Sequence, residues 1–261
     1  MSNISPQAVI EKGASIGENV IIAPFCFISK ESVIGDGTII DHNACIYGKT
    51  TIGKNNHIFS HAVVGSIPQD LKFNGEDVEL IIGDNNTIRE FTLLNPGTEG
   101  GGSKTVIGSH NLLMGYVHIG HDVIIGDSCI FANGATLAGH VEVGNHVVVG
   151  GLTPIHQFVK IGNYAMIAGA SALAQDVPPY CMAEGNRANL RGLNLTGLRR
   201  HIERSDIDAL KSAYRDLFES KNPLKDSATE LMMQIGQNSY VKELCEFVLN
   251  TKRGIPYERK S

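Results

Sequence analysis

The chain has 261 residues, 42% of them hydrophobic, with a formal net charge of −5 and a pI near 6.0, which suits one sizeable folded unit and a small appendage. The lack of a basic excess and the few aromatic residues argue against nucleic-acid binding, and no stretch reaches the roughly 18–20 apolar residues of a membrane span. The five cysteines are odd in number and form no Cys-x-x-Cys pair, so together with an N-terminus that lacks a signal pattern they predict a cytoplasmic protein.

An aliphatic residue recurs at every sixth position from the N-terminus, and a small or β-branched residue follows four positions after each of these anchors. This period is typical of a parallel β-helix, in which three hexads form one triangular coil and equivalent residues of successive coils stack about 4.8 Å apart. An amphipathic helix would show a period of about 3.6 instead. Asn56 stands at an inward position, where we expect stacked amides. The anchors of this first block are Ile4, Ile10, Ile16, Ile22, Ile28, Ile34, Ile40, Ile46, Ile52, Ile58 and Val64.

Residues 66–79 interrupt the repeat, which resumes in its original phase at Ile82. We interpret this segment as a loop that leaves the prism and replaces the sides of about one coil. A regular solenoid gains nothing from such an extrusion, although surface loops also tolerate insertion. Because the loop carries a compact polar set, Gln69, Asp70 and Lys72, we expect it to have a functional role.

A second loop, residues 95–105, contains the glycine run Gly100 to Gly102. The run is a weak indication of phosphate binding, because no helix N-terminus follows it. Beyond this loop the hexads continue without a break, one residue out of the earlier phase. Their anchors are Ile107, Leu113, Ile119, Ile125, Phe131, Leu137, Val143, Val149, Ile155, Ile161, Ile167 and Leu173.

Three histidines of the second block, His121, His140 and His156, follow one another at intervals close to one coil of three hexads. They fall within one or two positions of a single column, and His118 precedes His121 by one half of a hexad. None occupies an anchor or a small inward position, so all four point outward. A single outward histidine would be a solvated surface residue, but a column on successive coils predicts the centre of a functional site.

The solenoid is expected to span residues 1–180, because Val177-Pro178-Pro179 removes ladder donors and stops a strand. We expect residues 181–261 to form an α-helical unit that packs on the open end of the solenoid or on a neighbouring chain. We expect helices over 188–201, from an N-cap at Ser205, over 227–235 and after Asn238. The polar end, 251–261, is expected to fray.

A prism of this kind fills its own interior, so ligands must bind in grooves outside it. Flat outer faces favour symmetric self-association, and a cleft between two prisms would provide a concave site. We therefore expect a homotrimer with sites between subunits.

Several short motifs resemble one family along the whole chain: Ile67-Pro-Gln-Asp-Leu-Lys72, His118-Ile-Gly-His121-Asp122, Leu137-Ala-Gly-His140, His156-Gln157-Phe158 and Glu184-Gly-Asn186. They are similar to the acyl-[acyl-carrier-protein]–UDP-N-acetylglucosamine O-acyltransferases. The resemblance implies a left-handed parallel β-helix, an exception to the right-handed crossover rule. It also implies a cytosolic homotrimer that catalyses the first step of lipid A biosynthesis.

The resemblance implies transfer of an (R)-3-hydroxyacyl chain from acyl carrier protein to the 3-position of UDP-N-acetylglucosamine, without a metal or other cofactor. His121 matches the general base that takes the proton of the sugar hydroxyl, a role worth about 10²–10⁴ in rate. Asp122 matches the residue that orients this imidazole, which requires a corner of the coil because adjacent strand residues face opposite ways. The Gly139 N–H matches the donor to the thioester oxyanion.

Other matches concern substrate binding. In the family, residues matching Asp70 and Lys72 hold the sugar and its phosphate, and those matching His118, His140, His156 and Gln157 line the same groove. Asn194 and Arg200 match contacts to the nucleotide, although Arg200 could also be a solvated helix residue. Gly169 matches the position at which side-chain size limits acyl length, so the glycine implies a long chain unless it is a plain coil glycine.

Two positions depart from the family pattern. The chain reads Asn95-Pro-Gly-Thr98 where many members have His-Arg-Gly-Thr, and relatives with this variation are associated with a 3-amino sugar nucleotide. The acceptor is therefore either the hydroxyl or its 3-amino analogue. Thr196 stands where many members have a carboxylate, which affects one nucleotide contact.

Other classes of function remain open from the residues alone. Three histidines from adjacent coils could hold Zn²⁺, as in β-helical carbonic anhydrases, but that class does not account for the loop at 66–79 or for the Asn194–Arg200 segment. The glucosamine N-acyltransferases of the same pathway carry an additional N-terminal domain, whereas the hexads here begin at Ile4. A purely structural solenoid is the remaining alternative.

Overall fold

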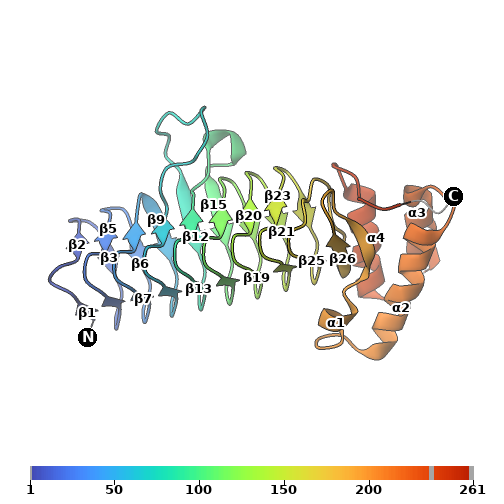
Figure 1. The fold of residues 1–261 in the computed structure, drawn as a ribbon, viewed down its shortest axis with the longest axis horizontal. Coiled ribbons are helices and arrows are strands. Elements are labelled where there is room, and N and C mark those ends of the chain that lie inside the picture. Colours follow the sequence, from blue (N-terminus) through green and yellow to red (C-terminus); the bar gives the residue numbers. More distant parts are fainter. Residues whose placement is uncertain (1, 235–237, 259–261) are drawn as a thin grey trace.

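The computed structural model describes residues 2–234 and 238–258. Short parallel strands wind into a left-handed β-helix, and a group of helices lies at its C-terminal end (Figure 1). The predicted fold class is confirmed.

The three faces of the prism are three sheets whose strands follow one another at every third position. The first sheet contains β1 Asn3–Ile4, β4 Ile21–Ile22, β7 Ile39–Ile40, β10 His57–Ile58, β13 Thr87–Ile88, β16 Leu112–Leu113, β19 Ile130–Phe131, β22 Val148–Val149, β25 Met166–Ile167, β26 Cys181–Glu184 and β27 Asn189–Leu193. The second contains β2 Val9–Ile10, β5 Phe27–Ile28, β8 Cys45–Ile46, β11 Val63–Val64, β14 Leu93–Leu94, β17 His118–Ile119, β20 Thr136–Leu137 and β23 Pro154–Ile155. The third contains β3 Ser15–Ile16, β6 Val33–Ile34, β9 Lys49–Ile52, β12 Glu79–Ile82, β15 Lys104–Ile107, β18 Ile124–Ile125, β21 Glu142–Val143 and β24 Lys160–Ile161.

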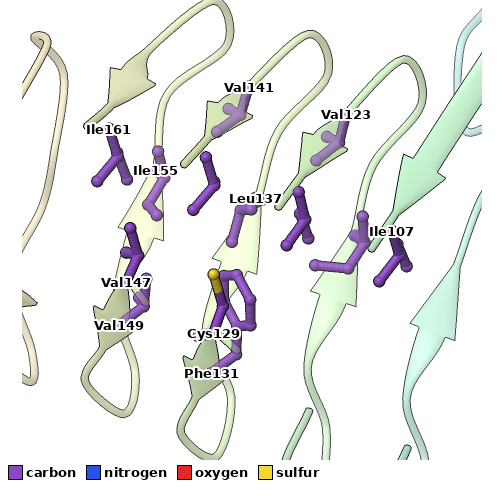
Figure 2. Packing of buried hydrophobic residues seen from close by; sticks show 14 of the residues in the cluster. Ile107, Val123, Cys129, Phe131, Leu137, Val141, Val147, Val149, Ile155 and Ile161 are labelled. Carbon is purple, nitrogen blue, oxygen red and sulfur yellow. The ribbon is translucent and has the colours of Figure 1, made fainter. Parts of the chain in front are cut away.

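The hexad anchors form the core of the prism. Ile22 pairs with Ile40, and Ile119 pairs with Leu137, each on the next coil along the chain. From Ile22 onward the anchors are almost fully buried, whereas Ile4 at the open N-terminal end is 41% exposed. Figure 2 shows the anchors and the small inward residues filling the space between the three sheets. All five cysteines carry free thiols.

An amide ladder runs through the interior, as predicted at Asn56. The Asn86 side chain donates from Nδ2 to Asn56 Oδ1 at 3.0 Å, and the Asn111 backbone N–H donates to Asn86 Oδ1 at 2.9 Å. Each of these side chains also satisfies the carbonyl of a nearby glycine. Buried polar groups are tolerated here because they are paired.

The two loops leave the same corner of the prism, between the second and third sheets (Figure 1). Ile82 stacks directly on Ile52 although the first loop lies between them in the chain, so this loop adds residues between β11 and β12. No side of the coil is lost, and the prediction that the loop replaces sides of a coil is wrong. The second loop contains the short 3₁₀ helix η1 Glu99–Gly101 and ends where β15 begins at Lys104.

The first predicted helix, 188–201, is largely wrong. Residues 189–193 form β27, which pairs antiparallel with β26, and only α1, Leu195–Leu198, is helical. β26 itself continues the first sheet beyond residue 180. The open backbone edge of β26 can pair with β27, and this pairing outweighs a weak helical preference in a segment that contains Gly192. The change from strand to helix therefore comes after Leu193.

The remaining helices are α2 Arg204–Tyr214, the π-helix η2 Arg215–Glu219, α3 Leu224–Gln234 and α4 Ser239–Asn250. Ser205 lies inside α2, and the N-cap is Glu203 instead of the predicted serine. The Asn238 side chain caps α4 by accepting from the Val241 N–H at 3.1 Å. Residue 235 of the third predicted helix lies outside the described residues. Within the described part of the chain no helix is long and apolar enough to cross a membrane.

The helices pack on the end of the solenoid, as expected, and share one core with it. Glu243 of α4 accepts hydrogen bonds from Asn163 at 2.6 Å and from the buried Tyr180 hydroxyl. The segment after α4 does not fray over residues 251–258. The Thr251 hydroxyl donates to buried Asp176 at 2.6 Å, and Ile255 is only 6% exposed.

Candidate functional site

The predicted base and its neighbour lie at the corner between β17 and β18. Asp122 has a left-handed backbone, with φ of 59°, which lets its side chain turn to the same side as that of His121. Asp122 Oδ2 lies 2.8 Å from His121 Nδ1, and the Asp122 side chain is 1% exposed. Since an ionised carboxylate can only accept, His121 Nδ1 donates this hydrogen bond and Nε2 keeps a free lone pair.

The second loop covers the Asp122 carboxylate. The Thr98 N–H donates to Oδ1 at 2.8 Å, and the Thr98 hydroxyl donates to Oδ2 at 2.6 Å. Gly101 packs so closely that a Cβ on it would overlap the carboxyl atoms. Close packing against Asp122 therefore explains why residue 101 is a glycine, and no bound phosphate is needed to explain it.

His140 stands one coil further along the same corner. Its ring meets the His121 ring at right angles with centroids 5.0 Å apart, and its Nδ1 is 3.8 Å from Asp122 Oδ2. Gly139 lies against His121, because a Cβ on it would overlap Cε1 and Nε2 of that ring. The two imidazoles and Gly139 therefore form one compact group.

The column of side chains at this corner differs from the prediction. Asp122, His140 and Phe158 occupy equivalent left-handed positions on successive coils, and the Phe158 ring stacks on His140 with centroids 4.4 Å apart. His156 and Gln157 are exposed beside Phe158, and His156 Nδ1 donates to the Gln157 carbonyl. The third member of the column is thus Phe158, because His156 stands two positions too early in the coil.

Burial lowers the pKa of two neighbouring histidines, His118 and His140. His118 is half-buried and donates from Nδ1 to the Leu93 carbonyl at 3.2 Å; burial lowers its pKa against the opposing effect of that hydrogen bond. Burial also lowers the pKa of His140, although Asp122 acts in the other direction. Both rings therefore favour the neutral form at pH 7.

The first loop forms one wall of a groove of about 310 Å³ beside His140. Asp70 and Lys72 line this groove opposite His140 and Phe158, and the Lys72 N–H donates to Asp70 Oδ1 at 3.0 Å. Gln69 is exposed on the same loop. The structure thus brings Asp70 and Lys72 of the first loop and His140 of the solenoid together around one open groove.

Two further predicted residues, Gly169 and Asn194, lie elsewhere on the chain. Gly169 follows β25 at the corner between the first and second sheets, and a Cβ on it would make only ordinary contact with Gly151. Asn194 caps α1: its side chain accepts from Gly197 and donates to the Tyr164 carbonyl. Within one chain these residues do not share the groove with His121.

Arg200 belongs to a basic pocket of about 630 Å³ on the helical end. Arg199, Arg204 and Lys211 line the same pocket, together with His201. Such a group of cations suits an anion such as a pyrophosphate.

The histidine corner also contains side chains that can bind a metal ion. Ligand atoms of His121, Asp122 and His140 lie within 4.8 Å of one another. The predicted set of three histidines is not assembled, because His156 lies outside this group. Moreover, both oxygens of Asp122 already accept hydrogen bonds from Thr98, so the donor set fits an orienting carboxylate better than a zinc ligand.

The sequence alone assigned no role to Thr98, Gly101 or Phe158. Phe158 could have been found from the regular one-coil spacing of Asp122, His140 and Phe158, counted from the aspartate. No periodic signal marks Thr98 or Gly101, because they lie in a loop outside the repeat.

Comparisons with known proteins agree with this geometry. The family model described as Udp N-acetylglucosamine O-acyltransferase, Domain 2, matches residues 176–256, and that of the bacterial transferase hexapeptide (six repeats) matches residues 104–139. The chain is 70% identical to the acyl-[acyl-carrier-protein]–UDP-N-acetylglucosamine O-acyltransferase of Aliarcobacter butzleri over the full length of both chains. Identity to the enzyme of the same name from Sulfurimonas denitrificans is 74%, covering 100% of this chain and 99% of that protein.

Solved structures lead to the same family. The UDP-N-acetylglucosamine acyltransferase from Campylobacter jejuni superposes with a TM-score of 0.95 at 49% identity, covering 98% of this chain and 100% of that one. Relatives of this identity and coverage match the fold along nearly its whole length. The chain therefore belongs to the acyl-[acyl-carrier-protein]–UDP-N-acetylglucosamine O-acyltransferases.

Proposed function

We propose that this protein transfers an (R)-3-hydroxyacyl chain from acyl carrier protein to the 3-position of UDP-N-acetylglucosamine, the first step of lipid A biosynthesis. The observation that carries the chemistry is the His121–Asp122 pair at the groove, with a 2.8 Å hydrogen bond that leaves Nε2 free. The free thiols of all five cysteines accord with the reducing cytoplasm, which we propose as its location.

His121 acts as the general base in this proposal. Nε2 takes the proton of the sugar 3-hydroxyl while its oxygen attacks the thioester carbonyl. The C–S bond then breaks, and the imidazolium returns the proton to the thiolate of the carrier. Asp122 stabilises the imidazolium by accepting from Nδ1.

Gly139 supplies the proposed oxyanion donor. Its N–H has no acceptor among the described residues, and its backbone touches the His121 ring. One such donor is worth roughly 10²–10³ in rate. A side chain at position 139 would collide with the imidazole, which explains why glycine stands there.

The remaining residues divide into three proposed binding groups. Asp70, Lys72 and Gln69 bind the sugar and its phosphate from the first loop, and His118, His140, His156 and Gln157 bind them from the solenoid. Of these residues, Asp70, Lys72 and His140 line the groove of one chain. Arg200 and Asn194 bind the nucleotide, with Asn194 acting partly by shaping the start of α1. Gly169 leaves room for a long acyl chain. Because these groups are separated on one chain, we propose a homotrimer in which neighbouring subunits complete each site.

The ester product is favoured over the amide by the environment of Asn95. Asn95 is 1% exposed, and its Nδ2 donates to the Ser66 and Ile67 carbonyls. These bonds tie the two loops together, a structural role that needs no 3-amino sugar, and the buried Oδ1 of Asn95 has no partner among the described residues. Mass spectrometry of the product from each acceptor distinguishes the two, since mild base cleaves the ester and leaves the amide intact.

The His121→Ala variant tests the mechanism. We expect the rate of acyl transfer to fall by about 10² or more, since a positioned base contributes about 10²–10⁴. His110→Asn is the control: His110 is an exposed histidine with a left-handed backbone at a different edge of the prism, and asparagine tolerates that backbone. A folded His121→Ala protein with the activity of wild type would refute the proposed base.

A further inference from the structure

The Asp122 carboxylate lies near two imidazole rings and could orient either of them. Its Oδ2 lies 2.8 Å from His121 Nδ1 and 3.8 Å from His140 Nδ1. A small rotation of the carboxylate would shorten one distance and lengthen the other. The groups that fix the orientation of the carboxylate therefore determine which imidazole it orients and which tautomer that imidazole adopts.

Thr98 holds the carboxylate at both oxygens. Its N–H donates to Oδ1 and its hydroxyl donates to Oδ2, at 2.8 and 2.6 Å. With these two bonds and the one to His121, the carboxylate is buried with both oxygens engaged. Two donors from one residue determine its rotation as well as its position.

The second loop is itself built to present Thr98. The Thr98 carbonyl accepts from the N–H groups of Gly101 and Ser103, at 3.0 and 2.8 Å, which closes a tight turn around η1. Gly101 presses on the carboxylate from the other side. Asn95 fastens the start of the loop to Ser66.

We propose that Thr98 and the turn ending at Gly101 are positioning elements of the reaction: they hold Asp122 toward His121 and away from His140, so that His121 keeps its proton on Nδ1 and its lone pair on Nε2. This inference rests on the proposed function of His121. Thr98 does not exchange protons with the substrate in this role, and it acts only through Asp122.

Thr98→Val removes the hydroxyl and keeps both the shape and the backbone N–H, whereas Thr98→Ser keeps the hydroxyl. We expect kcat to fall about 10- to 100-fold in the valine variant, the range for loss of an outer hydrogen-bond partner, with KM for the nucleotide sugar within about twofold of wild type. The serine variant should recover most of kcat. The acid side of the kcat/KM profile should move to lower pH in the valine variant, because a carboxylate that has turned toward His140 stabilises the His121 imidazolium less.

Gly101→Ala provides a second test that leaves the hydroxyl in place, because it puts a methyl group against the Asp122 carboxyl. We expect Gly101→Ala to lose kcat as Thr98→Val does. In an Asp122→Asn background, Thr98→Val should cause no further loss, because coupled residues are not additive.

The outcomes separate the two proposals. If His121→Ala keeps full activity, the proposed base fails. If His121→Ala is inactive but Thr98→Val matches wild type in kcat and pH profile, only the positioning role of Thr98 fails. A Thr98→Val variant that raises KM with unchanged kcat would instead make Thr98 a substrate contact and overturn the inference.

Discussion

A single backbone dihedral angle makes the His121–Asp122 pair possible. Consecutive residues of a strand point to opposite faces, so neighbours cannot normally bond side chain to side chain. Asp122 escapes this rule because its φ is 59° at a corner. Aspartate and asparagine tolerate this region better than most residues. The family resemblance required a corner at this pair, and the structure places one there.

His118 links the site to the stability of the fold. Burial lowers its pKa in the folded state below the ordinary value of about 6.5, so the unfolded chain binds more protons at mildly acidic pH. Its contribution to stability is therefore complete above pH 6.5 and is lost as the pH falls toward the lowered value. Urea midpoints at pH 7.5 and 5.5 should differ less in His118→Asn than in wild type. Equal pH sensitivity in His118→Asn and in the exposed control His110→Asn would contradict this account.

Among the elements, the two loops show how insertions alter a repeat without breaking it. Each loop leaves the second sheet and returns at the third, where β9, β12 and β15 remain paired in register. Backbone pairing is costly to lose, whereas a longer corner costs only a modest closure entropy. The sequence located both loops correctly. It could not show that the second loop folds over Asp122, because that contact joins a segment outside the repeat to a corner of the next coil.

The amide ladder is the element whose stability is easiest to test. Asn86→Ala would leave the buried Asn111 N–H and the Gly108 carbonyl without their partners. Each buried polar group left unpaired costs about 1–3 kcal/mol. Chemical denaturation should show a clear loss of stability, whereas Asn74→Ala in the exposed first loop should change the midpoint little. Identical midpoints for the two variants would mean that the ladder does not contribute.

At the scale of the whole molecule, the helical end is part of the solenoid core. Glu243 of α4 ties to Asn163 and Tyr180, and the segment after α4 returns to Asp176 near the last coil. The tail was expected to fray because it is polar. Instead, the backbone of the tail is hydrogen-bonded to β27: the Leu190 N–H donates to the Pro256 carbonyl at 2.7 Å. Asn194 is joined to this junction because its N–H donates to the Tyr180 carbonyl at 2.7 Å.

The proposed trimer can be tested directly by measuring the mass of the protein in solution. The groove beside His140 is open in one chain, and the predicted nucleotide and acyl-length residues lie away from it, which is why we propose that a neighbouring subunit completes the site. Light scattering should give a mass about three times the 28.1 kDa of one chain, unchanged on dilution through the assay range. A monomer with full acyl-transfer activity would contradict the proposal.

The amino-acid sequence by itself determined the prism, its outward histidines and the place of both loops. It could do so because a hexad repeats the same local requirement in every coil, and parallel stacking turns a spacing of three hexads into contact. Only the tertiary structure decided that Phe158 rather than His156 continues the column, that residues 189–193 pair as a strand, and that Thr98 holds Asp122. Those outcomes depend on left-handed corners, an open sheet edge and a loop outside the repeat, where no periodicity relates position in the chain to position in space.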